Sequence, residues 1–128
     1  MRKYVFIVEK TGTGYSAYAL DDNIHVGTVG NNMPDLRKNV LDAINTWREE
    51  EGLKDISGKD LVMRLDIAQF FEYYKVINSS ALAERIGISQ SLLSQYANRI
   101  KTPSEKQVNR ILTSIRDLGK ELTHLELI

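Results

Sequence analysis

Polar side chains that are able to read DNA bases lie close together in the second half of the chain. Gln90, Ser91 and Ser94 recur at helical spacing. A glutamine amide can form two hydrogen bonds with adenine, and a serine hydroxyl can donate or accept at several base edges. No acidic residue, which phosphates would repel, lies among residues 86–98. The segment therefore predicts DNA base contacts by five residues: Ser89, Gln90, Ser91, Ser94 and Gln95.

Basic residues gather around this segment although the net charge of the whole chain is zero. Six basic residues between Arg85 and Arg116 stand against one acid, Glu105. A local excess of this size is a modest electrostatic footprint for a phosphate backbone. Arg110 is one further candidate for a phosphate contact. The phosphate contacts that we chiefly expect come from three residues soon after the polar segment: Arg99, Lys101 and Lys106.

Residues 79–96 have the pattern of a helix-turn-helix, which would present these side chains to the major groove. Ala83 is small where a second helix must cross closely. Gly87 permits the left-handed backbone of the turn, and Ser89 can cap the second helix. Five apolar residues are expected to face inward: Leu82, Ile86, Ile88, Leu93 and Tyr96. The alternative is a pair of helices used only for packing.

A further helix is expected after the break at residues 101–104. Its apolar stripe of Val108, Ile111, Leu112, Ile115 and Leu118 should close the core. One recognition helix covers too few base pairs for useful specificity, so we expect a homodimer or a higher assembly. Ile115, Leu118 and Leu122 are candidates for its interface. The alternating tail 123–128 is a candidate strand across the two-fold axis.

The first half of the chain alternates with the period of strands. Tyr4, Phe6 and Val8 share one face, residues 12–14 form a turn, and residues 15–19 and 24–29 are two further strands. A helix should begin after Asn32 or Met33, because proline is tolerated in a first turn. It should extend through Trp47 and precede a strand at residues 61–65. The sequence thus predicts an α+β protein, with a β-β-β-α-β domain at 1–66 and an all-α domain at 67–128.

Several function classes are disfavoured by composition. The chain has no cysteine and two isolated histidines, so we expect no metal and no cofactor. No apolar stretch is long enough to cross a bilayer, which favours a cytoplasmic protein without a membrane partner. A nuclease would need several converging carboxylates. Those near strand ends are Glu9, Asp21, Asp22 and Asp35, and Asp21 and Asp22 are more typical of a turn. We therefore expect no catalytic residues and no enzyme activity.

The two halves together resemble the HicB family of antitoxins from type II toxin–antitoxin systems. The resemblance lies in Tyr4–Lys10, Gly14-Tyr15, Thr28–Asn32 and the helix at 36–47, followed by the helix-turn-helix. It implies a partial ribonuclease-H-like fold for residues 1–66, which would bind and mask a small, basic, HicA-like toxin that cleaves RNA. It also implies that residues 67–128 bind double-stranded operator DNA and repress the operon.

Two other functions remain open at this point. One is a stand-alone dimeric transcriptional repressor whose N-terminal domain binds a small ligand or only dimerises. The other is a degenerate nuclease. The first would lack a neighbouring gene for a short basic protein, and the second would cleave RNA in the presence of a metal ion.

Overall fold

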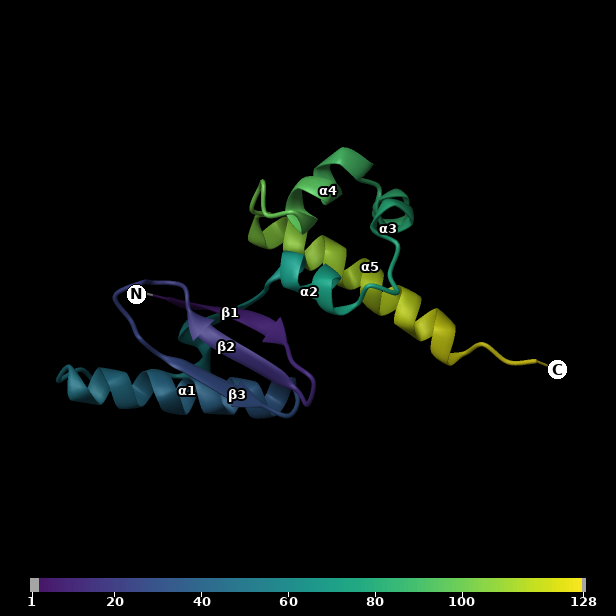
Figure 1. The fold of residues 1–128 in the computed structure, drawn as a ribbon. Helices are drawn as coiled ribbons and strands as arrows, with labels where there is room; N and C mark the ends of the chain where they lie inside the picture. Colours follow the sequence, from purple (N-terminus) through teal and green to yellow (C-terminus); the bar gives the residue numbers. More distant parts are fainter. Residues whose placement is uncertain (1–2, 128) are drawn as a thin grey trace. The chain divides into compact units, whose positions relative to one another are not determined.

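The computed structural model describes residues 3–127 of the chain. Within them it contains a four-stranded mixed sheet and five α-helices, so the α+β class expected from the sequence is confirmed. The contacts divide the chain into two compact units, of which unit 1 ends at Asp66 and unit 2 begins at Ile67 (Figure 1). No helix within residues 3–127 combines the length and the apolar composition needed to cross a bilayer.

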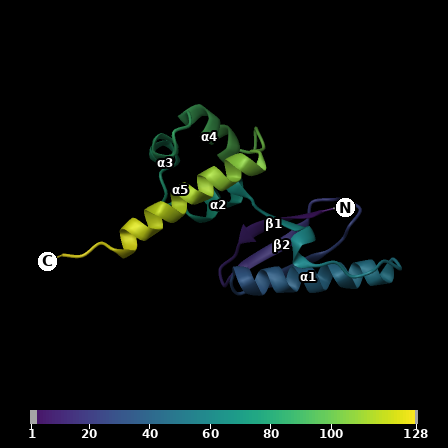
Figure 2. The ribbon, with the colours of Figure 1, turned by 180° about the vertical axis from the view of Figure 1, so that it is seen from behind.

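Unit 1 consists of a sheet with one long helix on it. Its strands are β1 (Tyr4–Lys10), β2 (Tyr15–Ala19), β3 (Gly27–Gly30) and β4 (Leu61–Leu65), in the order β3-β2-β1-β4. β1 pairs antiparallel with β2 and parallel with β4. Helix α1 (Met33–Glu50) covers one face of the sheet (Figures 1 and 2). A single apolar core between them contains the alternating residues of β1 and the inner stripe of α1: Tyr4, Phe6, Val8, Leu36, Val40 and Ile44.

The start of α1 is defined by two hydrogen bonds of Asp35. Asn32, one of the two expected caps, accepts a bond from the Asp35 backbone N–H with its Oδ1 at 2.9 Å. Asp35 in turn accepts one from the Asn31 N–H with its Oδ2 at 2.9 Å. Each bond satisfies a backbone donor at a helix start. The helix ends at Glu50, before Gly52 with its φ of 74°.

The predicted third strand was wrong at its start. It begins at Gly27 instead of Ile24, because the preceding turn is longer than the apolar pattern indicated. Asp21 accepts hydrogen bonds from two residues of this turn, one from the Asn23 N–H at its Oδ1 and one from the Ile24 N–H at its carbonyl. Ile24 is buried in the core from the turn itself. The burial of Ile24 therefore gave the apolar pattern of a strand, although the residue lies outside β3.

Unit 2 is built from four helices and a short tail. The helices are α2 (Ile67–Tyr73), α3 (Ser79–Ile86), α4 (Gln90–Ala97) and α5 (Glu105–Thr123). All four contribute to its buried side chains: Ile67, Ala68, Phe70, Leu82, Ala83, Leu93, Tyr96, Val108 and Ile111. The last turns of α5 and the tail extend beyond α2 and α3 in both views (Figures 1 and 2).

Within the described residues of the single chain the tail forms no strand, so the strand expected across a two-fold axis stays a prediction. Helix α5 continues through Thr123 and is capped at His124, and residues 125–127 have no regular secondary structure. Ile128, the last residue of that prediction, lies outside the described residues. A strand needs a hydrogen-bonded neighbour. The described residues of the chain offer none to this segment.

Candidate nucleic-acid interface

Helices α3 and α4 are joined by a tight turn of three residues. Gly87 adopts the left-handed conformation, with φ 88° and ψ 30°, and its N–H donates to the Ala83 carbonyl at 2.9 Å. Ala83 is fully buried. The Ser89 Oγ accepts a hydrogen bond from the Leu92 N–H at 3.0 Å and so caps α4. The predicted left-handed turn at Gly87 and the predicted cap at Ser89 are confirmed.

Helix α4 has one buried side and one exposed polar side. Leu93 and Tyr96 are buried, as expected, whereas Ile86 and Ile88 before the helix are only half-buried. Four of the five predicted base-contacting residues are exposed, and Gln95 is half-buried at the edge of the polar side. The four exposed residues are Ser89, Gln90, Ser91 and Ser94. The structure therefore gathers the predicted residues on and beside one exposed surface.

Two of the serines predicted to contact bases also form hydrogen bonds with α4 or with the residue after it. Ser89 accepts the capping bond, and the Ser94 Oγ accepts a hydrogen bond from Asn98 Nδ2 at 3.2 Å. A hydroxyl that accepts one bond can still donate its proton to another acceptor. Both serines therefore keep the capacity to donate to a base edge or a phosphate.

The backbone that follows α4 has an unusual feature at Arg99. The φ of this residue is 61°, the only positive φ of a non-glycine residue among those described. The Ile100 N–H donates to the Gln95 carbonyl at 2.9 Å and the Arg99 N–H to the Tyr96 carbonyl at 3.3 Å. This is the Schellman end of a helix, with arginine where glycine is usual. The left-handed conformation costs a non-glycine residue about 1 kcal/mol.

The predicted phosphate contacts lie directly after α4. Arg99 and Lys101 are in the loop and Lys106 is in the first turn of α5, and all three are exposed. The start of α5 is fixed by the Ser104 Oγ, which accepts from the Gln107 N–H at 3.2 Å. Gln107 Nε2 also donates to Tyr96 Oη at 3.5 Å and so links α5 to α4. Three positive charges therefore follow the exposed polar side of α4 in a structured segment.

Arg110 has a structural role that sequence reasoning missed. Its Nη2 donates to the carbonyls of Ile86 and Gly87, at 3.2 and 3.3 Å. The guanidinium group of α5 thereby holds the turn between α3 and α4. No local pattern indicates such a bond, because its partners lie more than twenty residues earlier in the chain.

Two of the acidic residues considered for a nuclease site bond to the backbone. Asp21 and Asp35, which the nuclease hypothesis would need, accept backbone hydrogen bonds at a turn and at a helix start. Within residues 3–127, no three histidine, aspartate or glutamate side chains lie near enough to one another to hold a metal ion.

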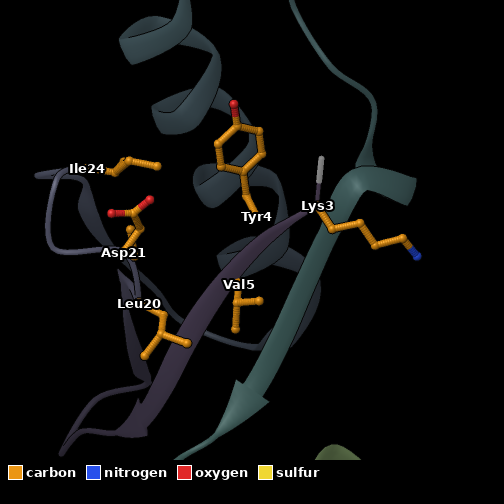
Figure 3. Close-up of a pocket in the computed structure, with 7 residues that line it drawn as sticks. Lys3, Tyr4, Val5, Leu20, Asp21 and Ile24 are labelled. Carbon is orange, nitrogen blue, oxygen red and sulfur yellow. The ribbon is translucent and has the colours of Figure 1, made fainter. Parts of the chain in front are cut away.

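A small cavity of about 190 Å³ lies beside the start of β1 and the end of β2. It is lined by residues from the start of β1, the end of β2 and the turn after it: Lys3, Tyr4, Val5, Ala19, Leu20, Asp21 and Ile24 (Figure 3). In Figure 3 the Lys3 side chain is directed away from Asp21. Sites for small molecules usually measure ~300–1,000 Å³. The cavity thus gives little support to a ligand-binding role of unit 1.

Comparison of the chain with protein-family models, with curated proteins and with solved structures finds no significant match.

Proposed function

We propose that the protein is an antitoxin that also represses its own operon. Unit 2 would bind double-stranded operator DNA through a helix-turn-helix formed by α3 and α4. Unit 1 would mask a small, basic, RNA-cleaving toxin of the HicA type, and both activities belong to the cytoplasm. The observation that carries the DNA-binding part is the exposed polar side of α4, held in place by Leu93 and Tyr96 on its buried side.

In this proposal α4 is the recognition helix. The major groove is about 12 Å wide and admits one α-helix, whose N-terminal part meets the base edges. Gln90 and Ser91 begin α4 and are exposed. Arg99, Lys101 and Lys106 would contact phosphates on the strand that flanks the groove. Phosphate contacts position the helix, and contacts with base edges give it specificity.

For unit 1 we propose a reduced ribonuclease-H-like fold with a toxin-binding surface. At the end of α1, Glu49, Glu50 and Glu51 follow Arg48 and leave a net negative charge that would suit a basic partner. Asp55 hydrogen-bonds to Glu49 and repels its charge, and both effects raise the pKa of the exposed Glu49 carboxyl. A cationic side chain from the partner would relieve this repulsion. The toxin must bind RNA, so a basic surface is expected of it.

Binding titrations with variants of α4 test the DNA-binding part. Gln90→Ala should weaken binding to the operator by about tenfold to 100-fold, because a bidentate base contact is worth ~1–3 kcal/mol. Binding to a scrambled duplex should change little. Equal losses on the two duplexes would contradict the assignment of α4 to the major groove.

Variants of the basic residues should behave differently in the same titration. Lys106→Ala should weaken binding to both duplexes and reduce the slope of log affinity against log salt by about one. Arg99→Gly should also weaken binding to both duplexes and reduce the salt slope. In addition it should raise the melting temperature, because glycine adopts the φ of 61° without strain. An Arg99→Gly protein with unchanged salt dependence would show that Arg99 does not contact phosphate.

A further inference from the structure

Ile100, directly after the left-handed Arg99, has a fixed backbone and a largely exposed side chain. Its N–H and that of Lys101 both donate to the Gln95 carbonyl, at 2.9 and 3.2 Å. These bonds belong to the Schellman motif that ends α4. The Ile100 side chain is nevertheless 76% exposed. The end of α4 therefore presents an apolar side chain to solvent from an ordered backbone.

A Schellman motif usually gives an apolar residue at this position a partner on the helix that it ends. The contact is made with the residue five or six positions earlier in the chain. For Ile100 those residues are Gln95 and Ser94, and both are polar. The motif thus places Ile100 beside two residues that are predicted to contact bases, and it offers the side chain no apolar neighbour.

The end of α1 contains the same motif with an apolar residue at the matching helical position. The Leu53 N–H donates to the Arg48 carbonyl at 2.8 Å, and Gly52 between them has a φ of 74°. Six residues before Leu53 lies Trp47, which packs against the core of unit 1. Leu53 is 46% exposed, compared with 76% for Ile100. The motif in α1 therefore offers an apolar neighbour, and the motif in α4 does not.

The charges around Ile100 favour DNA as the molecule that covers it. Arg99 and Lys101 flank this residue, and both are exposed. No acidic residue lies among residues 86–104. A phosphate backbone is attracted to a segment of this kind. In the major groove, DNA presents one apolar group at its base edges, which is the C5-methyl group of thymine.

We infer that Ile100 contacts the methyl group of a thymine in the operator and so adds this base to those that the protein selects. The inference rests on the proposed function, in which α4 lies in the major groove. Ile100 follows the C-terminal end of α4, so the thymine should lie at the edge of the bases that α4 reads. Isoleucine suits this role because its β-branched side chain has little rotational freedom to lose.

Replacement of thymine by deoxyuridine tests the inference, because deoxyuridine lacks only this methyl group. Each thymine of the operator duplex is replaced in turn, and the affinity of the full chain is measured by titration. At one position or more, the wild-type protein should bind about fourfold more weakly, as expected for one buried methyl group. Ile100→Ala should bind the unmodified operator at least about fourfold more weakly and should no longer respond to deoxyuridine at that position.

Leu53→Ala is the matched control, since Leu53 occupies the same place in the motif at the end of α1. This variant should keep the wild-type response to every deoxyuridine. Ile100→Ala should keep the wild-type melting temperature, because an exposed side chain contributes little to folding. Lost affinity at an unchanged melting temperature would support a contact with DNA over a role in folding.

Two outcomes would overturn the inference. One is an Ile100→Ala protein that responds to deoxyuridine at the same positions and to the same extent as the wild type, which would leave Ile100 at most a contact with the sugar–phosphate backbone. The other is an Ile100→Ala protein with unchanged affinity for the operator. Equal affinity of the wild-type protein for the operator and a scrambled duplex is a different result, which would contradict the proposed function together with this inference.

Discussion

Replacement of Gly87 by valine should remove operator binding and leave toxin neutralisation unchanged. Gly87 has a φ of 88°, and an added Cβ would lie 3.3 Å from the Arg110 Nη2 that holds the turn. A β-branched side chain is strained in this conformation by ~1–3 kcal/mol. The turn would relax into another shape and displace α4. We expect operator affinity to fall on the order of 100-fold, since ~2.7 kcal/mol corresponds to that factor.

Gly52→Val provides the matched control for this result. Gly52 also has a positive φ, of 74°, but lies after α1 in unit 1, and an added Cβ there meets no atom within 4 Å. This variant has the same kind of backbone strain and should retain operator binding. Growth rescue from the toxin and operator binding are the two measurements. If a folded Gly87→Val protein failed to rescue growth, unit 2 would take part in masking the toxin.

Gly30→Ala should have the opposite effect, with loss of toxin neutralisation and retention of operator binding. Gly30 ends β3, and an added Cβ would lie 2.4 Å from the backbone nitrogen of the fully buried Leu36. The nearest atoms belong to the backbone of α1, so no rotation of a side chain relieves the clash. Forced overpacking costs ~3 kcal/mol or more in such a case. A unit of this size has a free energy of unfolding of roughly 3–10 kcal/mol.

Denaturation by urea should show the loss of stability in Gly30→Ala, and the operator titration should show that unit 2 still binds. Gly12→Ala is the control in the same unit, because an added Cβ at Gly12 meets no atom within 4 Å. It should leave both activities unchanged. A Gly30→Ala protein that loses operator binding together with neutralisation would show that unit 2 does not fold or act independently of unit 1.

Local patterns in the sequence predicted most of the elements. The alternation of Tyr4, Phe6 and Val8 marks the buried face of β1, and the cap at Asn32 marks the start of α1. The turn at Gly87 was also predictable, because only a glycine adopts its φ easily. These features depend on neighbours within a few residues. The start of the third strand was predicted wrongly because a buried Ile24 in a turn gives the same apolar pattern as a residue in a strand.

The features that the sequence did not reveal depend on residues far apart in the chain. Arg110 reaches back to the carbonyls of Ile86 and Gly87, and Gly30 packs against the backbone of Leu36. The sequence did not predict the left-handed backbone conformation of Arg99, because arginine does not favour that conformation. For the candidate site, the sequence therefore predicted the exposed and buried sides of α4 but not the hydrogen bonds from Arg110 that hold the turn before it.

The most direct test of the account is a titration of the wild-type protein with the duplex from its own promoter, at several salt concentrations, beside a scrambled duplex. If α4 reads bases and the basic residues after it contact phosphates, the promoter duplex should bind at least ~1,000-fold more tightly. Affinity for both duplexes should fall as salt rises. Equal affinity for the two duplexes, or binding that salt does not weaken, would contradict the claim that this protein is a sequence-specific DNA-binding repressor.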